Sequence, residues 1–315
     1  MQTMNIVSYL VSPGIRTLTM TDGDASLLES LLDVDAHVVN CHDEPEFLAS
    51  LPGADIVLTW VFRQEWFSLA PRLRLVSTPA AGEDYFSVQW PEGVDHWNGA
   101  FHGEFMAETA VGMILGMARG ILPAVTTYAD NPWPRHEIDS IAQPLRESTV
   151  TICGFGKIGR ECGRLLKAFD AKIRGVSRQL HEAPDYFTSE DGCHTTEEID
   201  RLLPDTDHLL LVLPRTRETD RFLDARRIGL LPEHATVTNI GRGNAIDEDA
   251  LVKALESGRL AGAALDVTAT EPLPGCSPMR RCRNLWITPH SSAFNEHYME
   301  RYAEEFASRL NEKMS

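Results

Sequence analysis

Short apolar runs alternate with amphipathic stretches along the first hundred residues. The apolar runs at 5–10, 37–40, 56–60 and 73–77 predict strands, and the stretch 26–32 predicts a helix. Each run is too uniformly apolar for a sheet with one face in water, and is typical of a strand covered on both faces. The alternation therefore predicts a parallel sheet with helical crossovers.

The same pattern returns after a long apolar helix predicted at 104–120. Prolines at 123, 132 and 134 predict that an extended arm follows this helix. Beyond the arm, a strand, a glycine turn and a helix at 158–169 begin a second alternating region. Its strands are predicted at 149–153, 172–176, 208–213, 236–240, 262–266 and 285–288.

The C-terminal segment 296–310 predicts an amphipathic helix. Its apolar residues recur at four-residue spacing, namely Tyr298, Tyr302, Phe306 and Leu310. We expect this helix to pack on the N-terminal region and make that domain discontinuous. The predicted fold class is α/β, with two doubly wound, Rossmann-like parallel-sheet domains and a cleft between them. Residues 1–98 and 291–315 form a flavodoxin-like substrate-binding and catalytic domain, and residues 99–290 form a dinucleotide-binding Rossmann domain.

Three glycines of the long helix, Gly112, Gly116 and Gly120, lie four residues apart on one face. Small residues at this spacing allow another backbone to approach closely. Close packing inside one subunit and a subunit interface are both open at this point.

Composition narrows the class of partner. The chain has 315 residues and a formal net charge of −17, which disfavours nucleic acid because a phosphate backbone needs a basic surface. No basic, apolar leader opens the sequence, and the six cysteines form no CxxC pair. The apolar stretch 105–118 is shorter than the roughly 18 residues of a membrane span. We expect a cytoplasmic protein that binds neither nucleic acid nor a membrane.

The glycine turn carries the first chemical signal. TVTICGFGKIGRECG places Gly154, Gly156 and Gly159 directly after a predicted strand and at the start of a helix. In a dinucleotide-binding loop the first glycine makes the tight turn and the second lets the backbone approach the pyrophosphate. The third lets helix and strand pack closely, while the helix N-terminus faces the phosphates. The sequence therefore predicts a dinucleotide site.

The next strand indicates which dinucleotide is bound. A site for the ribose 2′-hydroxyl of NAD places an acidic residue at the tip of this strand, but here the tip reads Ser177-Arg178. Ser177 can donate to a 2′-phosphate, and Arg178 can pair with it and stack on the adenine. We expect NADPH or NADP⁺ to be favoured over NADH or NAD⁺; the alternative is that Arg178 is a solvated loop residue.

Arg242, Glu271 and His290 each follow a predicted strand, where open α/β sheets bind ligands. An arginine in the glycine-flanked turn suits bidentate capture of a carboxylate, although Arg242 could instead bond loop carbonyls. Two prolines stiffen the loop around Glu271, and Pro289 precedes His290. A carboxylate near an imidazole favours the imidazolium form, which can donate a proton to a carbonyl oxygen. We predict these three as the catalytic residues.

The segment NIGRGNAIDEDALVKALESGRLAGAALDVTATEPLP…NLWITPHSSA resembles the D-isomer-specific 2-hydroxyacid dehydrogenases. The resemblance runs from about Arg72 to Ala293. It implies that Arg242 anchors the substrate carboxylate and that His290, partnered by Glu271, is the acid/base. It also implies that Asp266 contacts the nicotinamide carboxamide and that Pro214 lines the adenosine side.

Two upstream segments extend the resemblance. LVSTPAAGEDYF resembles the substrate loop of the family, and this implies that backbone amides at Ala81 and Gly82 hold the substrate carboxylate. EFMAETA resembles a helix that packs at a dimer interface, so we expect a homodimer. Trp133 could reach a neighbouring subunit's pocket, or could pack the arm within an interface.

The predicted binding residues form two sets, and no metal site is predicted. The substrate-binding set is Ala81, Gly82, Arg242 and His290. The cofactor-binding set is Gly154, Phe155, Gly156, Lys157, Ile158, Gly159, Ser177, Arg178, Leu213, Pro214, Thr219, Ile240, Gly241, Arg242, Asp266 and His290.

These residues predict an NADPH-dependent reductase of a small 2-ketoacid, such as glyoxylate or hydroxypyruvate, that yields the D-2-hydroxy acid. One alternative is a dehydrogenase of a phosphorylated sugar acid. Glu83 and Asp84 disfavour it because that substrate needs basic residues near the substrate loop, although Arg72 and Arg74 on the preceding strand could contribute. A second alternative is a dinucleotide-sensing, corepressor-like interaction protein, which a similar triad does not exclude.

Overall fold

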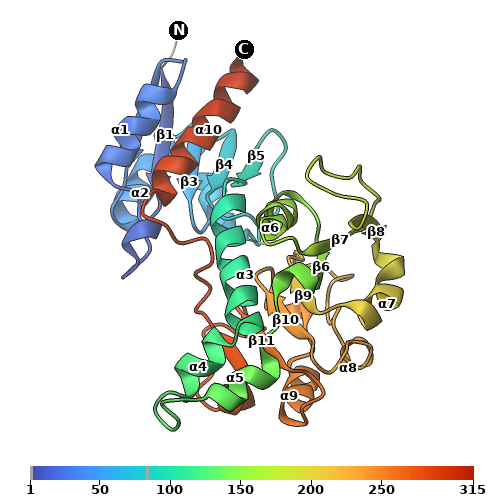
Figure 1. Cartoon of the computed structure of the whole chain (residues 1–315). Coiled ribbons are helices and arrows are strands. Elements are labelled where there is room, and N and C mark those ends of the chain that lie inside the picture. The colour runs from blue at the N-terminus through green and yellow to red at the C-terminus, as the bar shows by residue number, and fades with distance from the viewer. Residues whose placement is uncertain (1–2, 83–84) are drawn as a thin grey trace. The chain divides into compact units, whose positions relative to one another are not determined.

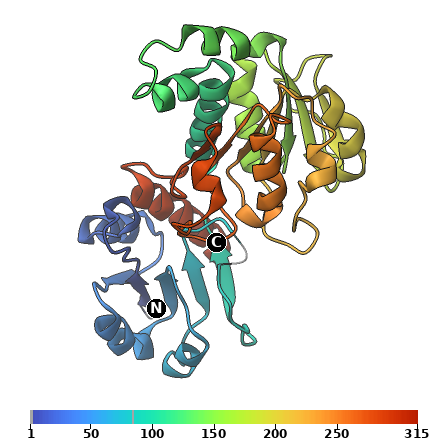
Figure 2. The same cartoon turned by 90° about the horizontal axis from the view of Figure 1, so that it is seen from below.

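The computed structural model describes residues 3–82 and 85–315. The chain forms two compact units, which are best followed separately (Figures 1 and 2). Unit 1 comprises residues 1–102 and 294–315, and unit 2 comprises Gly103–Ala293. The chain passes between the units at residues 102/103 and 293/294. From the sequence we predicted these domain boundaries at residues 98/99 and 290/291.

Unit 1 is built on a five-stranded parallel sheet in the order β2-β1-β3-β4-β5, the flavodoxin-like arrangement. Its strands are β1 (Met4–Tyr9), β2 (Ala36–Asn40), β3 (Ile56–Thr59), β4 (Leu75–Thr78) and β5 (Asp95–Asn98). Its helices are α1 (Asp22–Leu31), α2 (Glu44–Ser50) and α10 (Tyr298–Met314), with short 3-10 turns η1 (Arg16–Leu18), η2 (Leu51–Gly53) and η3 (Gln64–Leu69).

The C-terminal helix α10 completes unit 1, as the sequence predicted. It packs against α1 (Figure 1), and its apolar face is buried at Tyr302, Phe306 and Leu310. The hydroxyl of Tyr302 donates to Ser77 Oγ at 2.8 Å, which fixes the helix to the end of β4. The N-terminal unit is therefore discontinuous in sequence.

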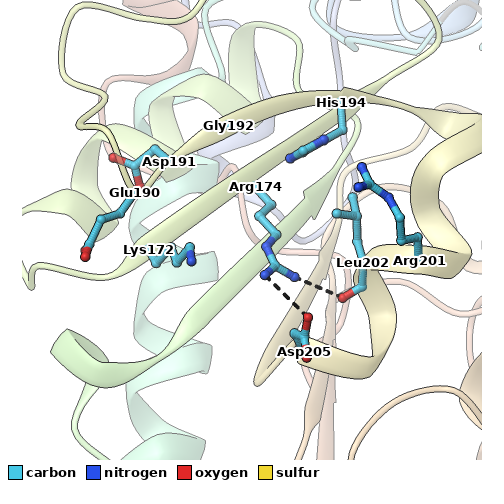
Figure 3. A pocket seen from close by; sticks show the side chains of 9 residues that line it. All are labelled: Lys172, Arg174, Glu190, Asp191, Gly192, His194, Arg201, Leu202 and Asp205. Atoms are coloured by element: carbon cyan, nitrogen blue, oxygen red, sulfur yellow. Dashed lines mark hydrogen bonds and ion pairs between the residues drawn. The ribbon is translucent and has the colours of Figure 1, made fainter.

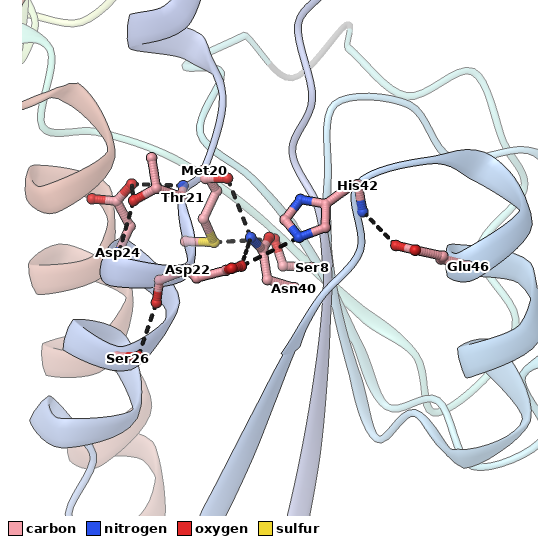
Figure 4. A network of polar contacts seen from close by, with 9 residues as sticks. All are labelled: Ser8, Met20, Thr21, Asp22, Asp24, Ser26, Asn40, His42 and Glu46. Atoms are coloured by element: carbon pink, nitrogen blue, oxygen red, sulfur yellow. Dashed lines mark hydrogen bonds and ion pairs between the residues drawn. The ribbon is translucent and has the colours of Figure 1, made fainter.

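A polar network fixes the start of α1 at the carboxyl ends of β1 and β2 (Figure 4). Thr21 caps the helix by accepting from Asp24 N, and the Asp24 carboxylate accepts from Thr21 N in return. The side chain of Asn40 donates to Asp22 Oδ1 at 2.9 Å and to the carbonyl of Met20. These bonds satisfy backbone groups that a helix start leaves unpaired, so we assign the network a structural role.

Unit 2 contains a seven-stranded parallel sheet in the order β12-β11-β10-β9-β6-β7-β8, a Rossmann arrangement with one added strand. Its strands are β6 (Thr149–Cys153), β7 (Lys172–Ser177), β8 (Gly192–Thr195), β9 (His208–Leu211), β10 (Thr236–Asn239), β11 (Gly262–Leu265) and β12 (Leu285–Ile287). Its helices are α3 (Gly103–Ala118), α4 (Ile121–Thr127), α5 (Arg135–Ile141), α6 (Lys157–Lys167), α7 (Ile199–Leu202), α8 (Ala225–Ile228) and α9 (Glu248–Glu256). Its 3-10 turns are η4 (Leu145–Glu147), η5 (Thr196–Glu198), η6 (Leu203–Asp205), η7 (Gly243–Ala245) and η8 (Pro278–Arg281).

Both faces of this sheet are buried, as its uniformly apolar strands predicted. Along β9, Leu209 and Leu211 join the cluster on one face, while Leu210 joins the cluster on the other. Side chains alternate between the faces of a strand, so a strand covered on both sides must be apolar throughout. Helix α3 packs against α6 on the face that contains Leu210.

The segment after α3 differs from its prediction. We expected an extended arm, but the arm contains the short helices α4 and α5. Pro123 lies in the first turn of α4 and Pro134 immediately precedes α5, where the backbone N–H that proline lacks would have no partner within the helix. A Cβ at Gly116 would crowd Leu122 and one at Gly120 would crowd Ile138, so these glycines pack the arm within the unit.

Within residues 3–82 and 85–315, no single helix is long and apolar enough to cross a membrane. Helices α3 and α4, which are bent by 72° relative to each other, together have the length and composition of a membrane span, and only these two criteria mark them. The same residues contain no group of three or more His, Cys, Asp or Glu side chains arranged to hold a metal ion.

Candidate active site

The predicted site residues of unit 2 follow the carboxyl ends of its parallel strands. The glycine loop follows β6, Ser177 ends β7 and Pro214 follows β9. Arg242 follows β10 and His290 follows β12. Because all seven strands are parallel, these loops lie at one edge of the sheet.

The glycine loop has the geometry that a dinucleotide requires. Gly154 has a φ of 96°, and a Cβ there would overlap the carbonyl oxygen of Val212. A Cβ at Gly159 would overlap the carbonyl oxygen of Gly154, so only glycine lets α6 pack this close to β6. A Cβ at Gly156 would meet nothing within 4 Å, which leaves open space at the start of α6. The loop therefore fits a pyrophosphate at the helix N-terminus.

Several predicted cofactor residues have buried side chains. Phe155 is 1% exposed, and its ring lies where a Cβ at Gly175 would overlap it. Leu213 and Ile240 are also buried, and Gly241 packs against the backbone of Leu213. Phe155, Leu213 and Ile240 can therefore meet a ligand mainly through their backbone.

The tip of β7 lies near the loop that follows β9. The hydroxyl of Ser177 donates to the carbonyl of Gln179 at 2.8 Å, so the donor expected for a 2′-phosphate is used within the loop. The pKa of Glu218 is lowered first by its own backbone N–H, then by the Thr216 hydroxyl and by the charge of Arg178. Thr219 Oγ1 donates to the carbonyl of Pro214 at 2.6 Å and closes that loop.

His290 and Glu271 are brought together. Nδ1 of His290 lies 2.8 Å from Oε2 of Glu271, and the two side chains are 50% and 38% exposed. The other carboxylate oxygen, Oε1, accepts from the backbone N–H of Thr268 at 3.0 Å. A carboxylate only accepts, so Nδ1 carries the proton of this bond and Nε2 is the ring nitrogen directed elsewhere.

The backbone of His290 is in the left-handed region, with φ at 52°. For a residue other than glycine this conformation costs about 1–3 kcal/mol and persists only where the surroundings impose it. The N–H of His290 donates to the carbonyls of Asp266, at 2.8 Å, and Thr288, at 3.0 Å. The carboxylate of Asp266 is buried and accepts from Thr288 Oγ1 at 2.5 Å, Ser291 N at 2.8 Å and Ser292 N at 2.9 Å.

Arg242 lies in a turn that packs directly on the loop of Glu271. A Cβ at Gly243 would overlap the backbone carbonyl of Thr268, the residue whose N–H holds Glu271. Nη1 of Arg242 donates to the carbonyl of Gly241 at 3.0 Å, which is the kind of bond expected for a structural arginine. Its role as carboxylate anchor stays a prediction.

A cavity of about 620 Å³ borders the His290–Glu271 pair. Its walls include the apolar side chains of Leu273, Met279 and Ile287, and Arg280 also lines it. Arg280 donates to the carbonyls of Leu273 and Pro274, so it ties η8 to the loop that carries Glu271.

The remaining predicted residues lie in other places. Ala81 and Gly82 follow β4 in unit 1, and the carbonyl of Gly82 accepts from Asn98 Nδ2 at 3.0 Å. Glu83 and Asp84, which bore on the sugar-acid alternative, lie outside the described residues. Arg72, also named for that alternative, is paired with the buried carboxylate of Asp55.

A second pocket, of about 320 Å³, lies at the amino ends of β7 and β8 (Figure 3). Arg174 bonds the carbonyl of Leu202 at 3.1 Å and lies 3.8 Å from Asp205. The pocket contains none of the predicted site residues, and its basic side chains share it with Glu190, Asp191 and Asp205. We assign it no role.

Comparison with known proteins identifies the family of the chain. The family model described as "D-isomer specific 2-hydroxyacid dehydrogenase, NAD binding domain" matches residues 111–292. A glyoxylate reductase of Thermofilum pendens is 31% identical over 302 residues, covering 90% of this chain and 86% of that protein. A glyoxylate/hydroxypyruvate reductase B of Yersinia pestis is 30% identical over 255 residues, covering 79% and 77%.

Two solved structures share the fold. One is a D-isomer specific 2-hydroxyacid dehydrogenase from Xanthobacter autotrophicus Py2 in complex with NADPH and MES (TM-score 0.79, 24% identity, 100% of this chain and 96% of that chain). The other is a D-lactate dehydrogenase from Aquifex aeolicus complexed with NAD and lactic acid (TM-score 0.72, 23% identity, 98% and 95%).

Proposed function

Because the chain belongs to the D-isomer-specific 2-hydroxyacid dehydrogenase family, we propose that it reduces a small 2-ketoacid to the D-2-hydroxy acid with NADPH. Family membership makes it an oxidoreductase of ketoacids. Glyoxylate and hydroxypyruvate are the proposed substrates, because they appear in the names of relatives at 30–31% identity. The observation that carries the proposal is the 2.8 Å contact between His290 Nδ1 and Glu271 Oε2.

Each proposed role follows from the chemistry of the side chain. Arg242 pairs with the substrate carboxylate, since a guanidinium offers parallel N–H donors that match two carboxylate oxygens. His290, oriented by Glu271, donates its Nε2 proton to the carbonyl oxygen and recovers a proton from solvent afterwards. When bound, the dinucleotide supplies the hydride that reaches the carbonyl carbon. Positioned proton transfer of this kind contributes roughly 10²–10⁴-fold to the rate.

The preference for NADPH rests on the tip of β7. Ser177 and Arg178 stand where NAD-binding members of this fold class place a carboxylate. A guanidinium attracts a 2′-phosphate, and no acidic side chain follows at Gln179 or Leu180 to repel it.

We also propose that the protein is a homodimer. The arm exposes Val125 and Tyr128 on or beside α4, and Trp133 before α5, at 70%, 66% and 80%. Exposed apolar side chains gathered on one segment are typical of an interaction site, and a second copy of the chain offers a matching apolar surface. Residues of α3 that resemble the family's interface helix adjoin this arm in sequence.

The first experiment measures initial rates with glyoxylate, hydroxypyruvate and pyruvate, each with NADPH and with NADH. We expect turnover of a short 2-ketoacid with NADPH, and a decrease of roughly 10²–10⁴-fold in kcat for His290→Ala. His297→Ala is the matched control, because His297 also contacts a glutamate but lies in α10's N-terminal cap. Full turnover by His290→Ala would refute the mechanism, and turnover with NADH alone would refute the cofactor preference.

A further inference from the structure

We propose that Asp266 is a positioning residue, whose buried carboxylate holds the chain at His290 in the left-handed conformation that the reaction needs. The proposal rests on the function proposed for His290. It differs from the contact with a nicotinamide carboxamide that the family resemblance implies for Asp266.

The backbone around His290 needs an external restraint. A φ of 52° is unfavourable for histidine, because its Cβ crowds the adjoining carbonyl oxygen. Without a restraint the residue would relax to negative φ, and the imidazole would turn away from Glu271. The observed Nδ1 to Oε2 distance of 2.8 Å therefore depends on the conformation of the main chain.

Asp266 supplies that restraint on both sides of His290. Its carbonyl accepts from His290 N, and its side chain accepts from the Thr288 hydroxyl before the histidine. After the histidine, the same side chain accepts from the N–H groups of Ser291 and Ser292. Four bonds from one residue thus hold the segment 288–292.

The carboxylate of Asp266 is largely committed to these bonds. A carboxylate has about four acceptor positions, and three are filled, with two donors on Oδ1 and one on Oδ2. Asp266 is 1% exposed, so these donors take the place of water around its carboxyl oxygens. These three bonds give Asp266 a positioning role in addition to any contact that its remaining acceptor position makes.

The substitution Asp266→Asn tests the proposal with little change in shape. In either orientation of the asparagine amide, its NH2 group replaces one carboxylate oxygen. That NH2 group then faces an N–H or hydroxyl donor of segment 288–292. We expect kcat to fall roughly 100-fold, as for a displaced catalytic group, while the NADPH dissociation constant changes less than about threefold. Thr288→Val removes one of the bonds and should give a smaller loss of kcat in the same direction.

Asp191→Asn is the matched control. Asp191 has a buried carboxylate in the same unit that accepts from Ile173 N and Thr188 N, outside the predicted site. We expect this variant to lose thermal stability and to retain kcat. An unchanged kcat in Asp266→Asn, or a rise in the dissociation constant with kcat retained at saturation, would overturn the proposal.

Histidine NMR separates this proposal from the proposed reaction. In the wild type we expect a protected Nδ1–H signal from His290, because Nδ1 donates to Glu271. Its loss in Asp266→Asn but not in Asp191→Asn would support positioning even if no 2-ketoacid were reduced. Its retention in Asp266→Asn would refute positioning even if the enzyme were active.

Discussion

Glu271 bonds His290 through one carboxylate oxygen and the backbone of Thr268 through the other. The bond from Thr268 therefore orients the Glu271 carboxylate within its own loop, independently of the imidazole. Oriented acceptors lose less conformational freedom when they bind a donor, so the contact with Nδ1 is well defined despite its partial exposure.

Replacing Glu271 by Gln should test the charge of this contact. Glutamine keeps the length of the side chain but not the negative charge that Nδ1 of His290 contacts. A hydrogen bond to a charged group contributes about 1.5–3 kcal/mol, and partial exposure places this one at the low end, so we expect kcat/KM to fall roughly tenfold. Steady-state kinetics across pH would measure this, and a variant as active as the wild type at every pH would show that the charge of Glu271 is not needed.

Arg178→Ala should weaken NADPH binding more than NADH binding. The loss of one charged contact to a 2′-phosphate corresponds to roughly 10-fold or more in the dissociation constant of NADPH. Fluorescence titration with both dinucleotides measures the two changes. Ser177→Asp, which adds a carboxylate at the same tip, should shift preference toward NADH, whereas equal losses for both dinucleotides in Arg178→Ala would refute the role of Arg178.

Two glycine substitutions in the same loop should have different effects. Gly156→Ala places a methyl group in open space, so it should preserve thermal stability and reduce dinucleotide binding by obstructing the approach of the pyrophosphate. Gly159→Ala forces a methyl group onto the carbonyl of Gly154 and should destabilise unit 2 by about 1–3 kcal/mol. Thermal unfolding and dinucleotide titration distinguish them; unaltered binding by Gly156→Ala would contradict the proposed path of the pyrophosphate.

His208 should make the protein sensitive to acid. Burial lowers the pKa of His208 from 6.5 to about 4, and its Nε2 has no hydrogen-bond partner in the described part of the chain. The unfolded chain thus binds a proton below pH 6.5, while the folded protein binds it only below about pH 4. The contribution of His208 to the free energy of unfolding is complete above pH 6.5 and falls by roughly 3 kcal/mol as the pH is lowered through this window. Urea unfolding of His208→Gln should show a smaller loss between about pH 6.5 and 4.5; an identical loss would exclude His208 as the cause.

Val125→Asp should weaken the proposed dimer. Val125 is 70% exposed on α4, and a buried, unpaired carboxylate at an interface is strongly unfavourable. Light scattering after size-exclusion chromatography would measure the change from dimer to monomer. Val61→Asp is the control, because Val61 is also exposed, at 54%, but lies in unit 1. A wild-type monomer, or a Val125→Asp variant that remains dimeric at micromolar concentration, would contradict this interface.

Some elements were missed because their own sequence carries little signal. Strand β5 reads DHWN, with only Trp97 fully buried, and forms because β4 offers it a parallel edge. Strand β8 has no fully buried residue and similarly depends on β7. Helix α2 has only seven residues, and its packing of Phe47 into the core of unit 1 is a tertiary contact. The arm was expected to be extended because its prolines were treated as helix breakers, although Pro123 lies in the first turn of α4 and Pro134 immediately precedes α5.

Local order along the chain was enough to predict the two parallel sheets, the tight turn at Gly154 and the close packing at Gly159. These features depend on neighbouring residues or on a period that the sequence displays directly. Contacts between distant segments depended on the folded structure: Glu271 with His290, Gly243 against Thr268, and Asp266 with Ser291 and Ser292. No local pattern indicates that His290 adopts a positive φ, because bonds from a residue 24 positions earlier impose it. The sequence identifies the chemical groups, and the packing of strand ends sets their distances and orientations.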